Sequence, residues 1–163
     1  MNNEINDLKR ITMSLTDIQI CLEYLEKILI FEENDIIYRA LSEAIIISYV
    51  RPFSGYNKKH HPITDLKKEF KKEFDKNETK IHDRVCHLRN EIIAHSDSKS
   101  YGVTLHVTEL DTDCKMLIPV QRRIPLLLSS EDVKILKKCS LKIERYLFDE
   151  QVRIKNILPP GNY

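Results

Sequence analysis

Apolar residues recur every three or four positions through most of this chain, and this is the spacing of one face of an α-helix. We therefore expect a mainly α protein of about five helices. The pattern predicts these helices over about 15–31, 36–50, 66–74, 78–94 and 129–155. Residues 4–12 either extend the first of these helices or form a short helix of their own.

Residues that cap helix N-termini stand before several of these segments. Such side chains accept hydrogen bonds from the first N–H groups of a helix, which have no partner within the helix. Their positions support the predicted helix starts. The capping sequences are Ser14-Leu15-Thr16-Asp17, Asn34-Asp35, Thr64-Asp65 and Ser129-Ser130-Glu131-Asp132.

The segment from Ile36 to Val50 is apolar over most of its circumference. A helix of this kind must be covered on several sides. It is therefore either the central helix of a bundle or part of a dimer interface. Pro52 follows closely and ends the helical pattern.

Two stretches do not fit the helical pattern. Residues 51–64 contain two prolines and a glycine, which predicts a central loop. Residues 101–121 alternate apolar and polar side chains on both sides of the turn-like Asp111-Thr112-Asp113, which predicts a β-hairpin before the last helix. We expect one domain over 1–163, ending in a tail at about 157–163.

Composition and charge indicate the cellular location of the protein, the state of its cysteines and the segment where an anionic ligand would bind. The chain has no apolar stretch of membrane-spanning length and a polar N-terminus, so we expect a cytoplasmic protein. Its 4 cysteines are scattered, which favours reduced buried thiols. Residues 1–50 hold four basic and nine acidic residues, and 51–100 hold twelve and eight. An anionic ligand would therefore bind the middle segment, although such charges also suit a solvated helix face.

The fourth predicted helix ends in Arg89-Asn90-Glu91-Ile92-Ile93-Ala94-His95. An arginine is a strong bidentate ligand for phosphate, and a histidine exchanges protons near neutral pH. Together they could cleave RNA without a metal ion, with Arg89 holding the phosphate and His95 acting as base or acid. On a helical wheel the two lie on opposite edges of the buried face, roughly 120° apart. A frayed last turn, a neighbouring helix or a second subunit would have to bring them together.

Spacing alone also allows a structural interpretation. Cationic side chains in the last turns of a helix bind its free carbonyl groups and interact favourably with the helix dipole.

The segment from Arg89 to His95 resembles the motif of the HEPN superfamily, an arginine, a polar residue and a histidine after four to six intervening positions. Arg89 matches the motif arginine, Asn90 the polar residue and His95 the histidine. The wider sequences at 47–53 and 88–97 resemble the abortive-infection-related HEPN branch. The resemblance covers about 15–97 and the last helix, but not the hairpin.

The resemblance implies an up-and-down helical bundle and a homodimer. It further implies a metal-independent endoribonuclease of a prokaryotic defence, phage-defence or toxin–antitoxin system, which needs no cofactor. The alternative is a non-catalytic helical module of the same superfamily that binds RNA or a protein partner, such as an antitoxin, through the same groove.

Other residues could extend an RNA-binding surface. Arg51 could add a second cation to the cleft, or be an ordinary exposed arginine beside Phe53. Lys58, Lys59, His60 and His61 could continue a phosphate-binding track. Aromatic side chains at 49, 53, 56 and 101 could stack on bases, although core packing suits the first two better.

A metal site is the main chemical alternative to the candidate ribonuclease site. His82 and Cys86 stand four residues apart, as do Asp83 and His87, and His60 and His61 could approach from the loop. The two pairs lie on different faces of the helix and do not converge, so we expect no metal site. Serine hydrolase, Rossmann and P-loop proteins are excluded because the chain lacks their glycine-rich turns.

Overall fold

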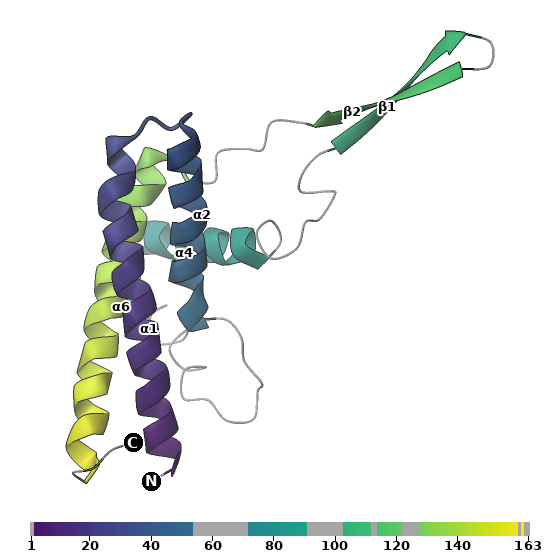
Figure 1. The fold of residues 1–163 in the computed structure, drawn as a ribbon. Coiled ribbons are helices and arrows are strands. Elements are labelled where there is room, and N and C mark those ends of the chain that lie inside the picture. The colour runs from purple at the N-terminus through teal and green to yellow at the C-terminus, as the bar shows by residue number, and fades with distance from the viewer. Residues whose placement is uncertain are drawn as a thin grey trace.

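Four helices pack against one another in the part of the chain described by this computed structural model (Figure 1). They are α1 (Asn2–Lys27), α2 (Ile36–Val50), α4 (Lys76–Leu88) and α6 (Ser130–Ile157). A mainly α fold is thus confirmed. The described residues are 2–53, 72–90, 103–111, 114–121, 128–159 and 161.

Helices α1 and α6 form the longest pair and run antiparallel. Near one end of the pair, the Gln151 side-chain amide donates to Thr12 Oγ1 at 2.9 Å. Near the other end, Lys137 Nζ lies 3.3 Å from Glu26 Oε1. Figure 1 accordingly shows the N- and C-termini at the same end of the molecule.

The predicted caps of α2 and α6 are confirmed. Asp35 accepts a hydrogen bond from the backbone N–H of Ile37 at 2.7 Å. Ser129 accepts from the N–H of Asp132, and Asp132 accepts in return from the N–H of Ser129. These two helices therefore begin where local sequence places them.

The start of α4 differs from the prediction by two residues. Asp75 accepts from the N–H groups of Asn77 and Glu78, and the Glu78 carboxylate accepts from the N–H of Asp75 at 2.8 Å. This capping box begins the helix at Lys76 rather than at Glu78. The helix predicted at about 66–74 lies mostly outside the described residues.

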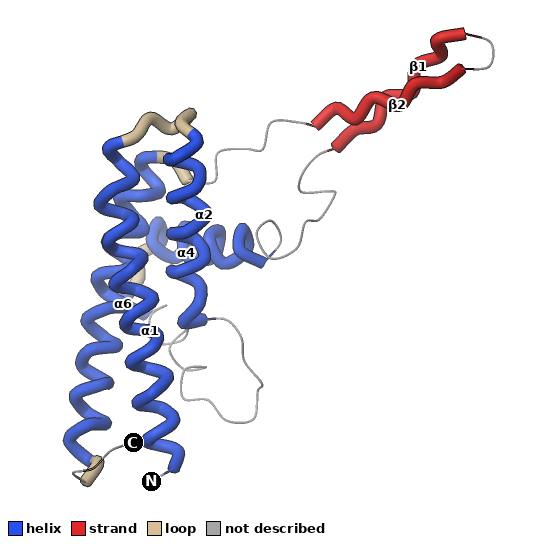
Figure 2. The backbone as a smooth tube through the Cα atoms, in the orientation of Figure 1, coloured by secondary structure: helices blue, strands red, loops and turns tan. Residues whose placement is uncertain are grey.

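Helix α4 runs across its neighbours instead of alongside them (Figures 1 and 2). It packs against both α2 and α6. Two ion pairs attach it to α6: Arg84 Nη1 lies 2.6 Å from Asp132 Oδ2, and Lys142 Nζ lies 2.7 Å from Glu78 Oε2. The described helices therefore depart from a simple up-and-down order at α4.

The end of α1 corrects one predicted core position. Residues 2–27 form one helix, so residues 4–12 belong to it and are not a separate helix. The backbone then tightens into a 3₁₀ turn, η1 (Ile28–Ile30). The helical spacing of Ile18, Leu22 and Leu25 predicts Leu29 as the next core residue, but Leu29 is 48% exposed. Ile28 is completely buried instead, because it follows the buried Cys21 by seven residues and Leu25 by three.

Buried aliphatic side chains and two tyrosines, Tyr38 and Tyr49, form the core between the helices. Cys21 also lies there, and burial raises the pKa of its thiol to about 12. Cys21, Cys86 and Cys139 are not in disulfides; Cys21 and Cys139 are buried, as the scattered spacing predicted, whereas Cys86 is half-buried.

Strands β1 (Val103–Asp111) and β2 (Cys114–Gln121) pair antiparallel, with Val103 opposite Gln121 and Thr108 opposite Met116. They occupy the segment in which alternation predicted a hairpin, and their register shifts between Glu109 and Asp111.

Within the described ranges, no helix combines the length and the apolar character that crossing a membrane requires.

Candidate functional site

Arg89 lies at the C-terminal end of α4 and is partly exposed. Its backbone N–H bonds to the carbonyl groups of Val85 and Cys86, so its main chain continues the helical turn. Its guanidinium Nη1 donates to Asn90 Oδ1 at 3.0 Å. The first two residues of the predicted motif thus contact each other through their side chains.

Arg89 differs from Arg84 and Arg153 in its charge pairing. Arg84 is paired with Asp132, and Arg153 with Glu150. Among the residues that the structure describes, no carboxylate lies within ion-pair distance of the Arg89 guanidinium, whose described partner is the neutral amide of Asn90. Its positive charge is therefore available to an anion.

Arg51 follows α2 in the short turn η2 (Arg51–Phe53). Its guanidinium Nη1 lies 3.2 Å from Asp17 Oδ1 on α1, and its side chain remains 58% exposed. Its carbonyl group accepts a hydrogen bond from Arg10. These contacts attach Arg51 to α1, and none of the described contacts joins it to Arg89.

The remaining predicted site residues lie outside the described residues. They are the motif histidine, His95, and the loop residues Lys58, Lys59, His60 and His61. Of the predicted site, Arg89 and Asn90 are thus brought together, and Arg51 lies apart on the α1 side.

Sequence reasoning missed a buried polar contact that fixes the position of α4. The sequence indicates His82 only as a candidate metal ligand, but its side chain is buried, with 3% exposed. Its Nδ1 lies 3.0 Å from the Tyr49 hydroxyl of α2. Its ring also makes edge contacts with Phe53 and Phe74, at centroid distances of 5.0 and 5.8 Å. A buried tyrosine hydroxyl needs a hydrogen-bond partner, and this rule is the sequence signal that points to His82.

The contact between His82 and Tyr49 also affects the direction of the Arg89 side chain. Arg89 follows His82 by seven residues, which is about two helical turns, so the two side chains leave α4 on the same side. Because Tyr49 holds His82 against the end of α2, it also fixes the direction in which α4 presents Arg89.

A second buried polar group secures the other end of α4. The Glu78 side chain is 5% exposed and lies 2.7 Å from Lys142 Nζ. This hydrogen bond raises the pKa of Lys142.

The other ion pair between α4 and α6 joins Arg84 to Asp132. Burial opposes ionisation of Asp132, but hydrogen bonds from Ser129 and Arg84 outweigh it and lower the pKa of that carboxyl group.

The two candidate metal-ligand pairs lie on different faces of α4, as their spacing predicted. Asp83 and His87 are exposed, whereas His82 is buried with its Nε2 3.7 Å from Cys86 Sγ. Within the described ranges, no group of three or more His, Cys, Asp or Glu side chains is arranged to hold a metal ion.

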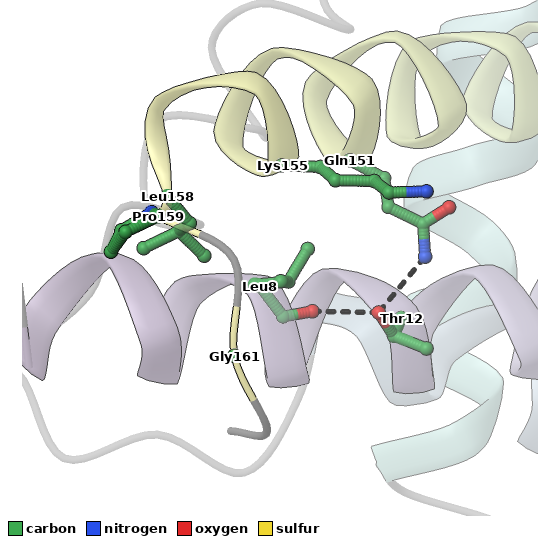
Figure 3. A pocket seen from close by; sticks show the side chains of 7 residues that line it. All are labelled: Leu8, Thr12, Gln151, Lys155, Leu158, Pro159 and Gly161. Carbon is green, nitrogen blue, oxygen red and sulfur yellow. Dashed lines mark hydrogen bonds between the residues drawn. The ribbon is translucent and has the colours of Figure 1, made fainter.

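A cavity of about 530 Å³ lies at the end of the bundle that carries both termini (Figure 3). Leu8, Leu158 and Pro159 supply apolar walls, and Thr12, Gln151 and Lys155 supply polar groups. Thr12 Oγ1 donates to the Leu8 carbonyl and accepts from Gln151 (Figure 3). Of the predicted site residues that the structure describes, Arg51, Arg89 and Asn90 do not line this cavity.

Comparisons with protein-family models, with curated proteins and with solved structures gave no match to this chain.

Proposed function

We propose that this chain is a HEPN-type endoribonuclease that cleaves RNA without a metal ion, in a prokaryotic defence or toxin–antitoxin system. The proposal rests on the resemblance of residues 89–95 to the HEPN motif. The observation that carries it is the partly exposed Arg89 guanidinium, held by Asn90 and not neutralised by any described carboxylate.

Arg89 would bind the scissile phosphate through two N–H groups. The packing of α4 against α2 and α6 supports this role because an arginine on a fixed helix keeps its direction when the ligand arrives. In the transition state, negative charge develops on the phosphate oxygens. A cation that is already in place stabilises this charge.

His95 would supply the proton transfer. As a base it takes the proton of the ribose 2′-hydroxyl, and the 2′-oxygen then attacks phosphorus while the 5′-oxygen leaves. As an acid it gives that leaving oxygen its proton. A single histidine makes one of these transfers at a time, so water or a second copy of the chain provides the other. The products are a 2′,3′-cyclic phosphate and a 5′-hydroxyl.

Asn90 is a positioning residue in this scheme because its amide oxygen accepts from Arg89 Nη1. Arg51, Lys58, Lys59, His60 and His61 would bind flanking phosphates and make RNA affinity fall as salt concentration rises.

The test of this function compares purified wild type with His95→Ala on single-stranded RNA and transfer RNA in excess EDTA. We expect wild type to cut RNA and His95→Ala to cut it about 100- to 10,000-fold more slowly, which is the contribution of general acid–base catalysis. Gel-resolved product formation over time measures both rates.

His87→Ala is the matched control because His87 is an exposed histidine of α4, close in sequence to Arg89. This variant should cut at the wild-type rate. Equal cleavage by wild type and His95→Ala, or cleavage that EDTA abolishes, would contradict the proposal. RNA binding without cleavage by wild type would instead identify a non-catalytic binding module.

A further inference from the structure

Cys86 lies on α4, one helical turn after His82, and has no part in the function proposed above. Its side chain is half-buried and thus partly open to solvent. Its Sγ lies 3.7 Å from His82 Nε2, a distance at which a thiol and a ring nitrogen share a hydrogen. A thiol that gives its proton to a neighbouring base becomes a thiolate, which is the nucleophilic form of cysteine.

His82 is itself held in place by a third group. The Tyr49 hydroxyl lies 3.0 Å from His82 Nδ1, and the rings of Phe53 and Phe74 make edge contacts with the imidazole. These contacts keep Nε2 directed toward Cys86. A nucleophile, a base and a group that orients the base form the usual arrangement around an activated side chain.

The hydrogen bonds that lead to His82 have a defined direction. The Glu78 backbone carbonyl can only accept, so the Cys139 thiol, at 3.9 Å, donates to it. The Tyr49 hydroxyl also bonds to Cys139 and is the donor, because the thiol hydrogen is already used. The Tyr49 oxygen is then left to accept from His82 Nδ1–H. Burial favours the neutral ring, so His82 Nε2 carries a lone pair toward Cys86.

Arg89 adds a positive charge near the same thiol. It follows Cys86 by three residues, and side chains at this spacing are neighbours on a helix surface. Its described partner is the neutral amide of Asn90. A cation beside a cysteine favours the thiolate. The base and the cation therefore act on Cys86 in the same direction.

Two other cysteines of the bundle have different surroundings. Cys21 and Cys139 are completely buried, and burial raises the pKa of both thiols to about 12, so both stay protonated at neutral pH. Their described partners are hydroxyl groups and backbone carbonyls, none of which takes up a proton near neutral pH. These two thiols provide an internal comparison for Cys86.

We propose that Cys86 is an oxidation site at which a hydroperoxide converts the thiol to a sulfenic acid, with His82 as the base. His82 Nε2 takes the thiol proton, and the sulfur attacks the terminal oxygen of the peroxide. The S–O bond forms as the O–O bond breaks. Sulfur is oxidised by two electrons, and the peroxide is reduced to water or an alcohol when His82 returns the proton to the departing oxygen.

The surroundings of the thiol suit a hydroperoxide. Hydrogen peroxide is small and uncharged, so a half-buried side chain remains within its reach. Negative charge develops on the departing oxygen, and the protonated His82 and the Arg89 guanidinium can both stabilise it. This inference does not depend on ribonuclease activity.

The experiment treats the reduced full chain with hydrogen peroxide in the presence of dimedone, which traps sulfenic acids. Mass spectrometry of the cysteine-containing peptides follows each position over time. Dimedone should label Cys86 about 10-fold faster than Cys21 and Cys139, or more. In a sample oxidised without dimedone, dithiothreitol should restore the Cys86 thiol, because sulfenic acids are reversible.

His82→Gln keeps a hydrogen-bonding side chain but removes the base. It should slow labelling of Cys86 about 10-fold or more, the lower range of a general base effect. Tyr49→Phe keeps the ring and removes the acceptor for Nδ1–H, so it should slow labelling by a smaller factor. His87→Gln is the matched control, because His87 is an exposed histidine next to Cys86, and its rate should equal that of wild type.

The direction of the change separates loss of the base from loss of structure. Partial unfolding exposes thiols and speeds their labelling, and faster labelling of Cys21 and Cys139 would reveal it. If His82→Gln unfolds in this way, Tyr49→Phe takes its place. Labelling of wild-type Cys86 no faster than Cys21 and Cys139 would overturn the inference. So would a folded variant that is labelled at the wild-type rate, or an equal slowing in His87→Gln.

Discussion

Arg89→Ala is expected to slow RNA cleavage by about 100- to 1,000-fold, the usual effect of removing one preorganised group that stabilises transition-state charge. The effect should be this large because Arg89 is a cation on a fixed helix, with no carboxylate among its described contacts. Single-turnover cleavage of a labelled RNA, with enzyme in excess, measures the change without a contribution from product release.

Arg89→Lys separates charge from geometry. A lysine keeps the positive charge but cannot bind phosphate with two parallel N–H groups, so its rate should fall between wild type and Arg89→Ala. Arg145→Ala is the control, because Arg145 is an exposed arginine on α6. If Arg89→Ala and Arg145→Ala cut equally fast, Arg89 does not bind the scissile phosphate.

Tyr49→Ala is expected to lower the free energy of unfolding by about 3–5 kcal/mol, as deletion of a large buried aromatic ring does. Tyr49 is completely buried, contacts the rings of Phe53 and His82, and bonds to His82 Nδ1. Burial also raises the pKa of its hydroxyl, which therefore stays protonated as a hydrogen-bonding group.

Tyr49→Phe keeps the ring and removes only the hydroxyl, which leaves the buried His82 nitrogen without this partner. The expected loss is about 1–3 kcal/mol. Urea unfolding followed by circular dichroism measures both losses, and Phe148→Ala, at an exposed position on α6, should lose little. Equal stability of Tyr49→Phe and wild type would show that the contact between α2 and α4 does not depend on this hydrogen bond.

The starts of α2 and α6 were predictable because their capping signals are local: Asp35 and Ser129 cap these helices as their residue types indicate. The helix start predicted at Ser14-Leu15-Thr16-Asp17 was wrong, because these residues lie in the interior of α1. The Asp75 cap was missed because the predicted helix at about 66–74 was taken to continue through Phe74, which left Asp75 no role as a cap.

Helix ends and crossings were less predictable because they depend on tertiary contacts. At the end of α1, Ile28 and not Leu29 packs in the core. The crossing of α4 depends on partners distant in sequence, such as Tyr49 for His82 and Lys142 for Glu78. A helical wheel of α4 alone contains neither partner.

In the candidate site, too, features set by local sequence were predictable and features set by distant contacts were not. Local sequence placed Arg89 and Asn90 in the last part of the fourth predicted helix, and the structure has them at the C-terminal end of α4. The hydrogen bond between their side chains was not predicted. It could not show that Arg51 binds Asp17, because that carboxylate comes from α1. The pairing of Arg89 with His95 stays a prediction.

The most direct test of the proposed ribonuclease uses two substrates of identical sequence in EDTA, one an unmodified single-stranded RNA and the other carrying 2′-O-methyl groups throughout. We expect that only the unmodified RNA is cut and that mass spectrometry finds 2′,3′-cyclic phosphate ends on the products. Cleavage of both substrates, or products with 3′-hydroxyl ends, would contradict attack by the 2′-oxygen and with it the proposed role of His95.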